Sequence, residues 1–327
     1  MVAAGRMEQG MLEGIASILP LLILIVIGFV CAKQPWFGPK GMDFLTKFNL
    51  DIAIPLYLFY SVTRTYSRPS AILELVRNVQ YPAILILFGM VVGFVICLFL
   101  GIRAPQRSVF INAVSLSNVV VMGLPVVASL FGERVLPIAM VYYACNSLLY
   151  WTVGVWLLRR DAGRGGSIGV WGTIKTVFLS RPLLGLMAGV AWVCLGLSLP
   201  QFAVKSLGMI SSAVTPLAMV FIGSVIRYAD FRNIGNSRLL AFIVGYRLLI
   251  VPLVAGALCS LFPVSVAMKK VFFILSNMPS MAQLPIMSKE VGGDYELASL
   301  TTAVTTALSM IAVPVYVFLM NYYSVFD

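Results

Sequence analysis

Two asparagines within long apolar stretches carry side chains suited to binding a small anion. Asn118 and Asn277 each directly follow a serine, at positions 117 and 276. A side-chain amide donates two hydrogen bonds and also accepts them, so it can bind a carboxylate without the cost of burying a permanent cation. The same amide can instead satisfy backbone groups where a helix is interrupted. The sequence allows both roles, and the two can coexist.

Prolines and a glycine near these asparagines predict broken helices. Gly123 and Pro125 follow the first asparagine, and Pro279 and Pro285 follow the second. A proline lacks the amide hydrogen that would bond the carbonyl four residues earlier, and in lipid each freed carbonyl is costly unless another group satisfies it. The ends of such half-helices present dipoles that can receive an ion or a polar group. Two helices that are merely kinked are the alternative.

Charged residues within apolar stretches are the next candidates, because ionisable groups inside a membrane span are functional by default. Asp43, Lys47 and Asp51 are spaced four residues apart and therefore share one helix face. Asp51, with Lys47 beside it, could serve as a proton or cation site; an Asp51–Lys47 ion pair near the membrane surface is the alternative. Arg247 could attract an anion, although we favour extension of its side chain to the inner membrane surface.

Two further polar residues, Asn146 and Gln283, are the best candidates among the remaining ones to line a pathway. The chain has no histidine and its five cysteines lie far apart, so we expect no metal site, no cofactor and no disulfide. A hydrolase would need clustered ligands or a second deep aspartate beside Asp51. We therefore predict that the protein is not an enzyme.

The composition excludes a soluble protein. Of the 327 residues, 60% are apolar and 11% are charged, and the mean hydropathy is +0.98, whereas a soluble domain is roughly half apolar and a quarter charged. A chain of this kind cannot bury so much apolar surface by folding on itself, which rules out soluble enzymes and nucleic-acid binders. We therefore assign the net charge of +11 to membrane topology rather than to nucleic acid.

Ten apolar runs are long enough for membrane helices, each of which needs about 20 residues. They fall at 14–32, 43–63, 79–102, 108–131, 135–158, 182–202, 206–226, 239–262, 268–288 and 298–323. Their apolar residues do not alternate with polar ones, so helices rather than strands are expected. We predict an all-α polytopic membrane protein with ten transmembrane helices, of which the fourth and ninth are broken.

A polar linker at 159–181 separates two similar halves, 1–158 and 182–327. Landmark residues recur in the same order at offsets of 159 to 162 positions: Pro20 and Pro182, Pro55 and Pro216, Asn118 and Asn277, and Pro125 and Pro285. Each half carries five expected spans, and an odd number turns the second copy upside down. We therefore predict two inverted five-helix repeats, an arrangement typical of secondary transporters.

Lysine and arginine predict the orientation, because they are enriched in cytoplasmic loops. With the N-terminus outside, the inner loops hold 13 of these residues and the outer side holds eight. We predict that both termini lie outside, in the plasma membrane, which is the inner membrane of a bacterium.

The motifs resemble those of the auxin efflux carrier family, which comprises the plant PIN carriers and their bacterial relatives. The resemblance runs over the whole chain and rests first on NVVVMGLPVV at 118–127. The supporting motifs are Gly132-Glu133, Pro55-Leu56, Thr215-Pro216-Leu217, Met278-Pro279 and Lys289-Glu290.

The resemblance implies a fold in which spans 4 and 9 cross where they break. Spans 1, 2, 6 and 7 would form a scaffold that supports a homodimer, and spans 3–5 and 8–10 would form a moving transport unit. Substrates of such a family are small organic anions: auxin in plants, and carboxylates such as malonate or malate proposed for bacterial members. In plant members the asparagine of the first motif contacts the substrate carboxylate, and the resemblance assigns this role to Asn118. Asn277 occupies the matching position in the second repeat.

We therefore predict a secondary transporter that moves a small organic anion, auxin-like or a mono- or dicarboxylate, by alternating access. One negative charge leaving through 100 mV gains about 2.3 kcal/mol, which favours export. Import would need coupled protons or sodium, and Asp51 is the only acid placed for such coupling. The main alternative is a sodium-coupled organic anion symporter of the bile acid symporter type. A sodium/proton antiporter, a channel or a sensor are further alternatives.

Overall fold

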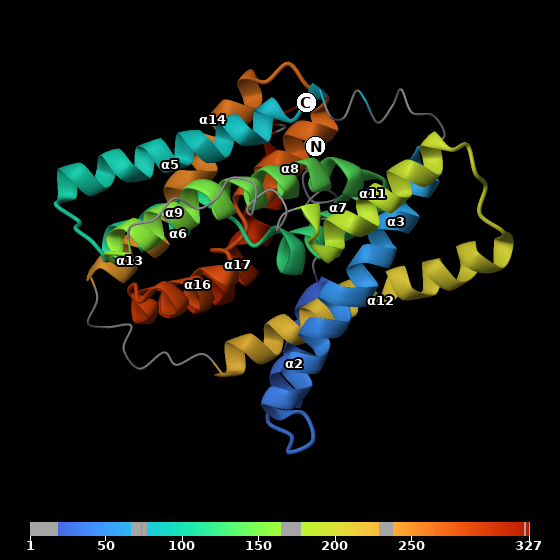
Figure 1. Cartoon of the computed structure of the whole chain (residues 1–327), viewed down its shortest axis with the longest axis horizontal. Helices are drawn as coiled ribbons and strands as arrows, with labels where there is room; N and C mark the ends of the chain where they lie inside the picture. The colour runs from blue at the N-terminus through green and yellow to red at the C-terminus, as the bar shows by residue number, and fades with distance from the viewer. Residues whose placement is uncertain are drawn as a thin grey trace, which may run out of the picture.

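The computed structural model describes residues 19–66, 73, 77–164, 178–228, 238–323 and 325–326. Within these ranges the regular secondary structure is helical (Figure 1). The first half forms the helix Leu19–Cys31 and then α2 (Gly38–Phe48), η1 (Asn49–Ala53), α3 (Ile54–Thr65), α5 (Gln80–Leu100), α6 (Gln106–Ser115), η2 (Val119–Gly123), α7 (Leu124–Phe131), η3 (Glu133–Val135), α8 (Leu136–Leu149), η4 (Tyr150–Gly154) and α9 (Val155–Asp161). The second half forms α11 (Arg181–Cys194), α12 (Gln201–Tyr228), α13 (Arg238–Gly245), η6 (Tyr246–Ile250), α14 (Val251–Leu261), α15 (Val266–Ser276), α16 (Gln283–Val291) and α17 (Tyr295–Tyr322).

Several of these helices have the length and composition of membrane spans. Among the described residues, five are long and apolar enough to cross a membrane: Gln80–Leu100, Glu133–Asp161, Gln201–Tyr228, Arg238–Leu261 and Tyr295–Tyr322. Shorter apolar helices include Leu19–Cys31, Val119–Phe131 and Arg181–Cys194. These helices support an integral, polytopic membrane protein, whereas the count of ten spans stays a prediction.

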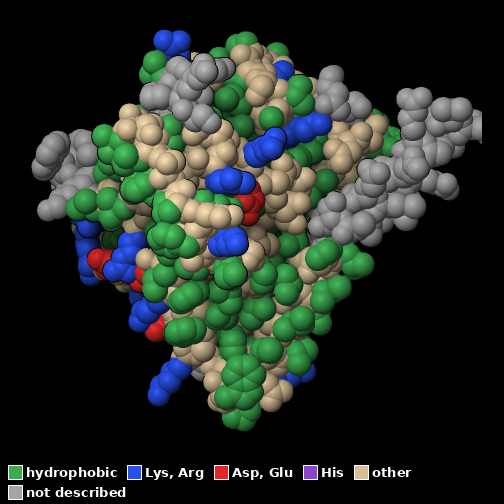
Figure 2. All heavy atoms as spheres, turned by 90° about the vertical axis from the view of Figure 1, so that its right-hand side faces the viewer, with side chains coloured by type: hydrophobic (Ala, Val, Ile, Leu, Met, Phe, Trp, Pro, Cys, Tyr) green, Lys and Arg blue, Asp and Glu red, His purple; other side chains and the backbone are tan. Residues whose placement is uncertain are grey.

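The outer surface agrees with a lipid environment. Large apolar side chains are exposed on α5, with Leu98 at 62% and Phe99 at 86%, and on α14, with Leu253 at 71%. Figure 2 shows hydrophobic side chains that cover the lower half of one face almost continuously, with basic side chains scattered above and beside them. An apolar surface of this extent is rare on soluble monomers.

Three π-helical turns accommodate prolines within helices. The turns η1, η2 and η6 end two residues before Pro55, Pro125 and Pro252. The proline ring clashes with the carbonyl of the preceding turn in a regular α-helix, and a wider turn relieves this clash without opening the helix. These prolines therefore mark widened turns, and not helix ends.

The helices pack in two groups. In the first group, α3 packs against α11 and α12, and α12 also contacts α2. In the second group, α5 packs against α6, α8 and α14, and α17 packs against α13 and α16. Figure 1 shows the first group toward the bottom and right, and α5, α9, α13 and α16 toward the left. Contacts of α12 with η2, α7 and α17 join the two groups.

Glycines allow very close helix crossings within the first group. A Cβ atom on Gly28 would lie 2.0 Å from the Val220 carbonyl oxygen, and one on Gly189 would lie 3.1 Å from the Phe59 carbonyl oxygen. Adding 161 to Gly28 and Phe59 gives Gly189 and Val220, so the same contact occurs twice with the halves exchanged. Small residues at such crossings are typical of membrane helix packing.

Candidate functional site

The two predicted helix interruptions lie against each other. The backbone between α6 and η2 meets the backbone between α15 and α16, where Ser117 and Ser280 form an isolated antiparallel bridge. The Asn118 N–H donates to the Pro279 carbonyl at 2.9 Å, and the Ser280 hydroxyl donates to the Ala113 carbonyl at 3.0 Å. The backbone groups released by one interruption are therefore bound partly by the other, as a low-dielectric interior requires.

The position of the first interruption differs from the sequence prediction. We expected Pro125 to open the helix, but α6 ends at Ser115 with Leu116 extended, and Pro125 lies in the first turn of α7. The widened turn η2 absorbs the missing amide hydrogen, so the helix resumes before the proline. In the second interruption, Pro279 lies in the gap itself and Pro285 lies within the first turn of α16.

Gly123 brings the two interrupted segments together. A Cβ atom at this position would lie 2.7 Å from Leu275 Cδ2 and 3.4 Å from Met278 Cγ. The Gly123 N–H also donates to the Asn118 carbonyl at 3.0 Å, which closes the π-turn after the gap. The glycine thus serves the packing of the site, and no other residue type fits there without displacing Leu275.

Asn118 and Asn277 differ in how their side chains are engaged. Asn118 is 8% exposed, and within the described part of the chain no hydrogen bond engages its side-chain amide. Asn277 is 1% exposed, and its Nδ2 donates to the Phe273 carbonyl at 2.8 Å. Its Oδ1 is buried without a hydrogen-bond partner among the described residues. Asn118 is therefore the asparagine whose donors are available to a ligand.

Asn146 binds both backbone polar groups of Ser117. Its Oδ1 accepts from the Ser117 N–H at 3.0 Å, and its Nδ2 donates to the Ser117 carbonyl at 3.0 Å. Thr305, which is 159 positions later, accepts from the Ser280 N–H through its Oγ1 at 3.2 Å. The two halves thus brace the two bridge residues, Ser117 and Ser280, in a similar way. Nothing in the sequence singled out Thr305 from the other polar residues of its helix.

Replacing Asn146 with alanine is expected to destabilise the protein more than it changes transport. The substitution leaves the buried Ser117 N–H without a partner, which costs about 1–3 kcal/mol. It also removes one of two donors from the Ser117 carbonyl, which keeps its bond from the Val119 N–H at 2.9 Å. A lower apparent melting temperature in detergent, relative to Asn321→Ala at an exposed position of α17, would show this. A wild-type melting curve for Asn146→Ala would contradict the bracing role.

Gln283 begins α16, and its carbonyl accepts from the Tyr150 hydroxyl at 3.0 Å. Its side chain is partly exposed. Its role in lining a pathway stays a prediction.

Arg247 is the largest departure from the sequence prediction. We favoured extension to the membrane surface, but the side chain is 1% exposed and lies at the paired interruptions. It donates to the Val114 carbonyl at 2.7 Å, the Ser117 Oγ at 2.6 Å and the Met278 carbonyl at 2.5 and 3.1 Å. All four acceptor contacts are to uncharged groups, and none of the ion pairs found among the described residues involves Arg247.

Asp51 pairs with a different partner from the one considered in the sequence. The alternative of an Asp51–Lys47 ion pair is wrong, because Lys47 pairs with Asp43 at 2.8 Å. Asp51 instead forms an ion pair with Arg181 at the start of α11. This pair joins the two halves of the chain, and both side chains are partly exposed, at 38% for Asp51 and 59% for Arg181.

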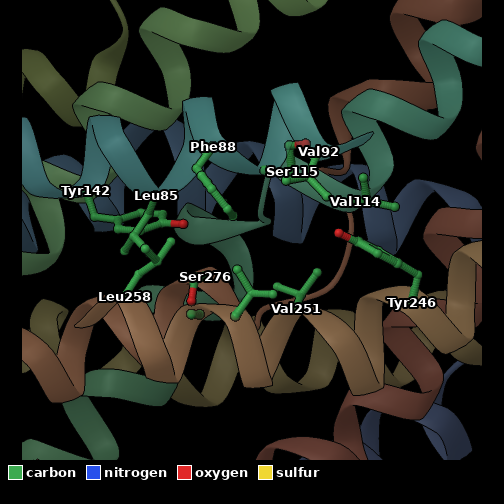
Figure 3. A pocket seen from close by; sticks show the side chains of 13 residues that line it. Leu85, Phe88, Val92, Val114, Ser115, Tyr142, Tyr246, Val251, Leu258 and Ser276 are labelled. Carbon is green, nitrogen blue, oxygen red and sulfur yellow. The ribbon is translucent and has the colours of Figure 1, made fainter. Parts of the chain in front are cut away.

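Two pockets flank the paired interruptions. One has about 420 Å³ of empty space and lies between α5 and α14, where the Tyr142 and Tyr246 hydroxyls point inward from opposite ends (Figure 3). The other has about 330 Å³ and is lined almost entirely by apolar side chains, including Met122 of η2 and Met219 of α12. Across the described ranges, no cluster of three or more His, Cys, Asp or Glu could hold a metal ion.

Comparisons with known proteins agree on one family. The family model described as membrane transport protein matches residues 14–167 and 172–317. An uncharacterized transporter of Methanothermobacter thermautotrophicus is 25% identical over 304 residues, covering 92% of this chain and 96% of the relative. An uncharacterized transporter of Methanocaldococcus jannaschii is 24% identical over 320 residues, covering 91% of this chain and 96% of the relative.

Proposed function

We propose that this chain, which belongs to the membrane transport protein family of the auxin efflux carriers, is a secondary transporter. It moves a small organic anion by alternating access. The family and its transporter relatives identify a transporter and not an enzyme. The substrate class, the coupling and the mechanism are the parts that we propose.

The buried guanidinium of Arg247 carries the proposal of an anionic substrate. It lies at the paired interruptions, with neutral acceptors around it and no acidic partner in the described part of the chain. A buried cation without a counter-ion is costly, and an anion bound nearby lowers that cost. The Asn118 amide offers the hydrogen-bond donors that a carboxylate needs.

The proposed architecture consists of ten spans in two inverted repeats, 1–158 and 182–327, joined by a cytoplasmic linker at 159–181. Spans 4 and 9 cross at the paired interruptions, spans 1, 2, 6 and 7 form a scaffold that dimerises, and spans 3–5 and 8–10 form the transport unit. The exchanged glycine contacts and the matched positions of Asn146 and Thr305 support the repeats. Both termini would lie on the outer side of the plasma membrane.

A sodium-coupled symporter of the bile acid symporter type is the second candidate. The observation that favours it is a set of buried oxygen atoms without hydrogen-bond partners among the described residues, including Asn277 Oδ1 and Thr301 Oγ1. Such oxygens suit a cation. The positive charge of Arg247, which donates to the carbonyl of Met278 beside Asn277, opposes a cation there.

Asp51 is our proposed site for proton coupling, and its substitution tests that role. Asp51→Asn cannot bind and release a proton, so we expect anion flux driven by membrane potential to persist while its response to a pH gradient disappears. Asp43→Asn is the matched control, since Asp43 is a second acid on the same helix. Equal pH responses in wild type and Asp51→Asn would exclude Asp51 as the coupling site.

Charge movement on a solid-supported membrane tests the substrate class. Purified protein would receive indole acetate, malonate and malate in turn, with and without sodium and at two pH values. We expect a saturating current for at least one anion that is independent of sodium. A current that requires sodium would favour the symporter, and the absence of any current would remove these anions from consideration.

A further inference from the structure

Arg247 ties together segments that the proposed mechanism moves as one body. Its own turn, η6, belongs to the eighth expected span. Val114 lies in the last turn of α6, the first part of the fourth span, and Met278 lies in the interruption of the ninth. Hydrogen bonds of 2.5 to 3.1 Å join the guanidinium to the other two segments, the fourth and ninth spans. Because these segments all lie in the proposed transport unit, the charge of Arg247 must travel with that unit.

The surroundings leave this charge uncompensated. The described acids that form ion pairs, Asp43, Asp51 and Asp161, pair with Lys47, Arg181 and Arg107. The guanidinium has five N–H donors, four of which are used by uncharged acceptors. A single negative charge bound at the interruptions neutralises the charge of Arg247, whereas a doubly charged anion leaves a net negative charge in a low-dielectric interior, which is costly.

We propose that Arg247 selects a monovalent anion as cargo and that the membrane voltage acts on the return of the empty transport unit. This inference rests on the proposed alternating-access function. The loaded unit carries no net charge from this site, so its movement in either direction is insensitive to voltage. In the empty unit the positive charge of Arg247 is uncompensated, and a negative interior draws this charge back to the inward-facing state.

Two kinds of flux should respond differently to the membrane voltage. Exchange of anion for anion uses only the neutral loaded unit, so its rate does not depend on voltage. Net export requires the empty unit to return, and a full charge crossing 100 mV changes that equilibrium by roughly 50-fold. Net export should therefore rise with an inside-negative potential while exchange stays constant.

Voltage steps on reconstituted full-length protein, first with no organic anion present, provide the test. We expect a transient charge movement in wild type and in Arg247→Lys, which keeps the positive charge. We expect no such transient in Arg247→Gln, with size-exclusion profiles confirming that each variant is folded. Saturating indole acetate, a monoanion, should suppress the wild-type transient, whereas fully ionised malonate should not.

The outcomes distinguish this inference from the proposed function. A wild-type protein that transports indole acetate without any charge movement in its absence would overturn the inference and leave the function intact. An Arg247→Gln transient equal to that of wild type would also overturn it, and if that variant does not fold, a voltage-dependent exchange rate in wild type has the same meaning. A transient that depends on Arg247 but responds to neither indole acetate nor malonate would support the moving charge and reject these organic anions as substrates.

Discussion

Replacing Gly223 with alanine is expected to separate two helices and to produce one of the largest stability losses available from a single methyl group. A Cβ atom at this position would lie 1.9 Å from the Ile25 carbonyl oxygen and 2.7 Å from the Phe29 nitrogen. Both neighbours are backbone atoms, which cannot move aside by changing rotamer. Overpacking costs about 1–3 kcal/mol and occasionally more, and we expect a loss at the upper end of this range.

The measurement is the apparent melting temperature of the detergent-purified protein. At about 2–4 °C per kcal/mol for a large domain, Gly223→Ala should melt at least roughly 6 °C below wild type. Gly245→Ala is the matched control, because Gly245 is also helical and a Cβ atom there would meet nothing within 4 Å. Equal melting temperatures for the two variants would contradict the close crossing between α12 and the helix Leu19–Cys31.

Replacing Asn118 with alanine is expected to weaken substrate binding strongly while leaving the fold intact. A hydrogen bond to a charged group contributes about 1.5–3 kcal/mol, which corresponds to a loss of affinity of roughly 10- to 150-fold. The backbone bonds of residue 118 to Pro279 and Gly123 do not involve the side chain. The paired interruptions should therefore survive the substitution.

The Asn146→Ala variant is the control for this prediction, because it is expected to affect stability rather than substrate binding. Asn118→Ala should show a raised half-saturating concentration for the transported anion and a melting temperature close to that of wild type. Asn146→Ala should show the opposite pattern, since both ends of its amide already bind Ser117. If Asn118→Ala retains wild-type half-saturation, Asn118 does not bind the substrate.

Much of the fold could be predicted because a helix that crosses a membrane needs a long run of apolar residues, which is visible in the sequence. Long apolar runs indicate helices, and the described helices fall within or close to those runs. The family resemblance that rested on the motif at 118–127 was confirmed by the family model that matches residues 14–167 and 172–317. The resemblance and the composition together were sufficient for the class of protein.

The details of the site depended on contacts between segments far apart in the chain. Proline chemistry predicted interruptions near Pro125, but the π-turn before that proline moved the gap to Leu116–Asn118. Arg247 was expected at the surface because snorkelling depends only on its own helix. Its actual partners, Val114, Ser117 and Met278, come from two other spans that no local pattern places beside it.

The same limitation applies to Asp51. A spacing of four residues predicts that Asp51 and Lys47 share a helix face, and Lys47 in that position can pair with either neighbouring acid. In the structure Lys47 pairs with Asp43, and Asp51 pairs with Arg181, which lies at the end of the linker and starts α11. A tertiary contact thus overrode the local pattern.

Counterflow in proteoliposomes tests the central claim most directly. Vesicles carrying the wild-type protein would be loaded with unlabelled indole acetate, malonate or malate and diluted into a trace of the same labelled anion, with Asn118→Ala treated in parallel. A carrier with alternating access predicts transient accumulation of label above the outside concentration for at least one anion, abolished or strongly reduced in Asn118→Ala. Equilibration without accumulation, at equal rates in both proteins, would contradict the account of an organic anion carrier with its site at the paired interruptions.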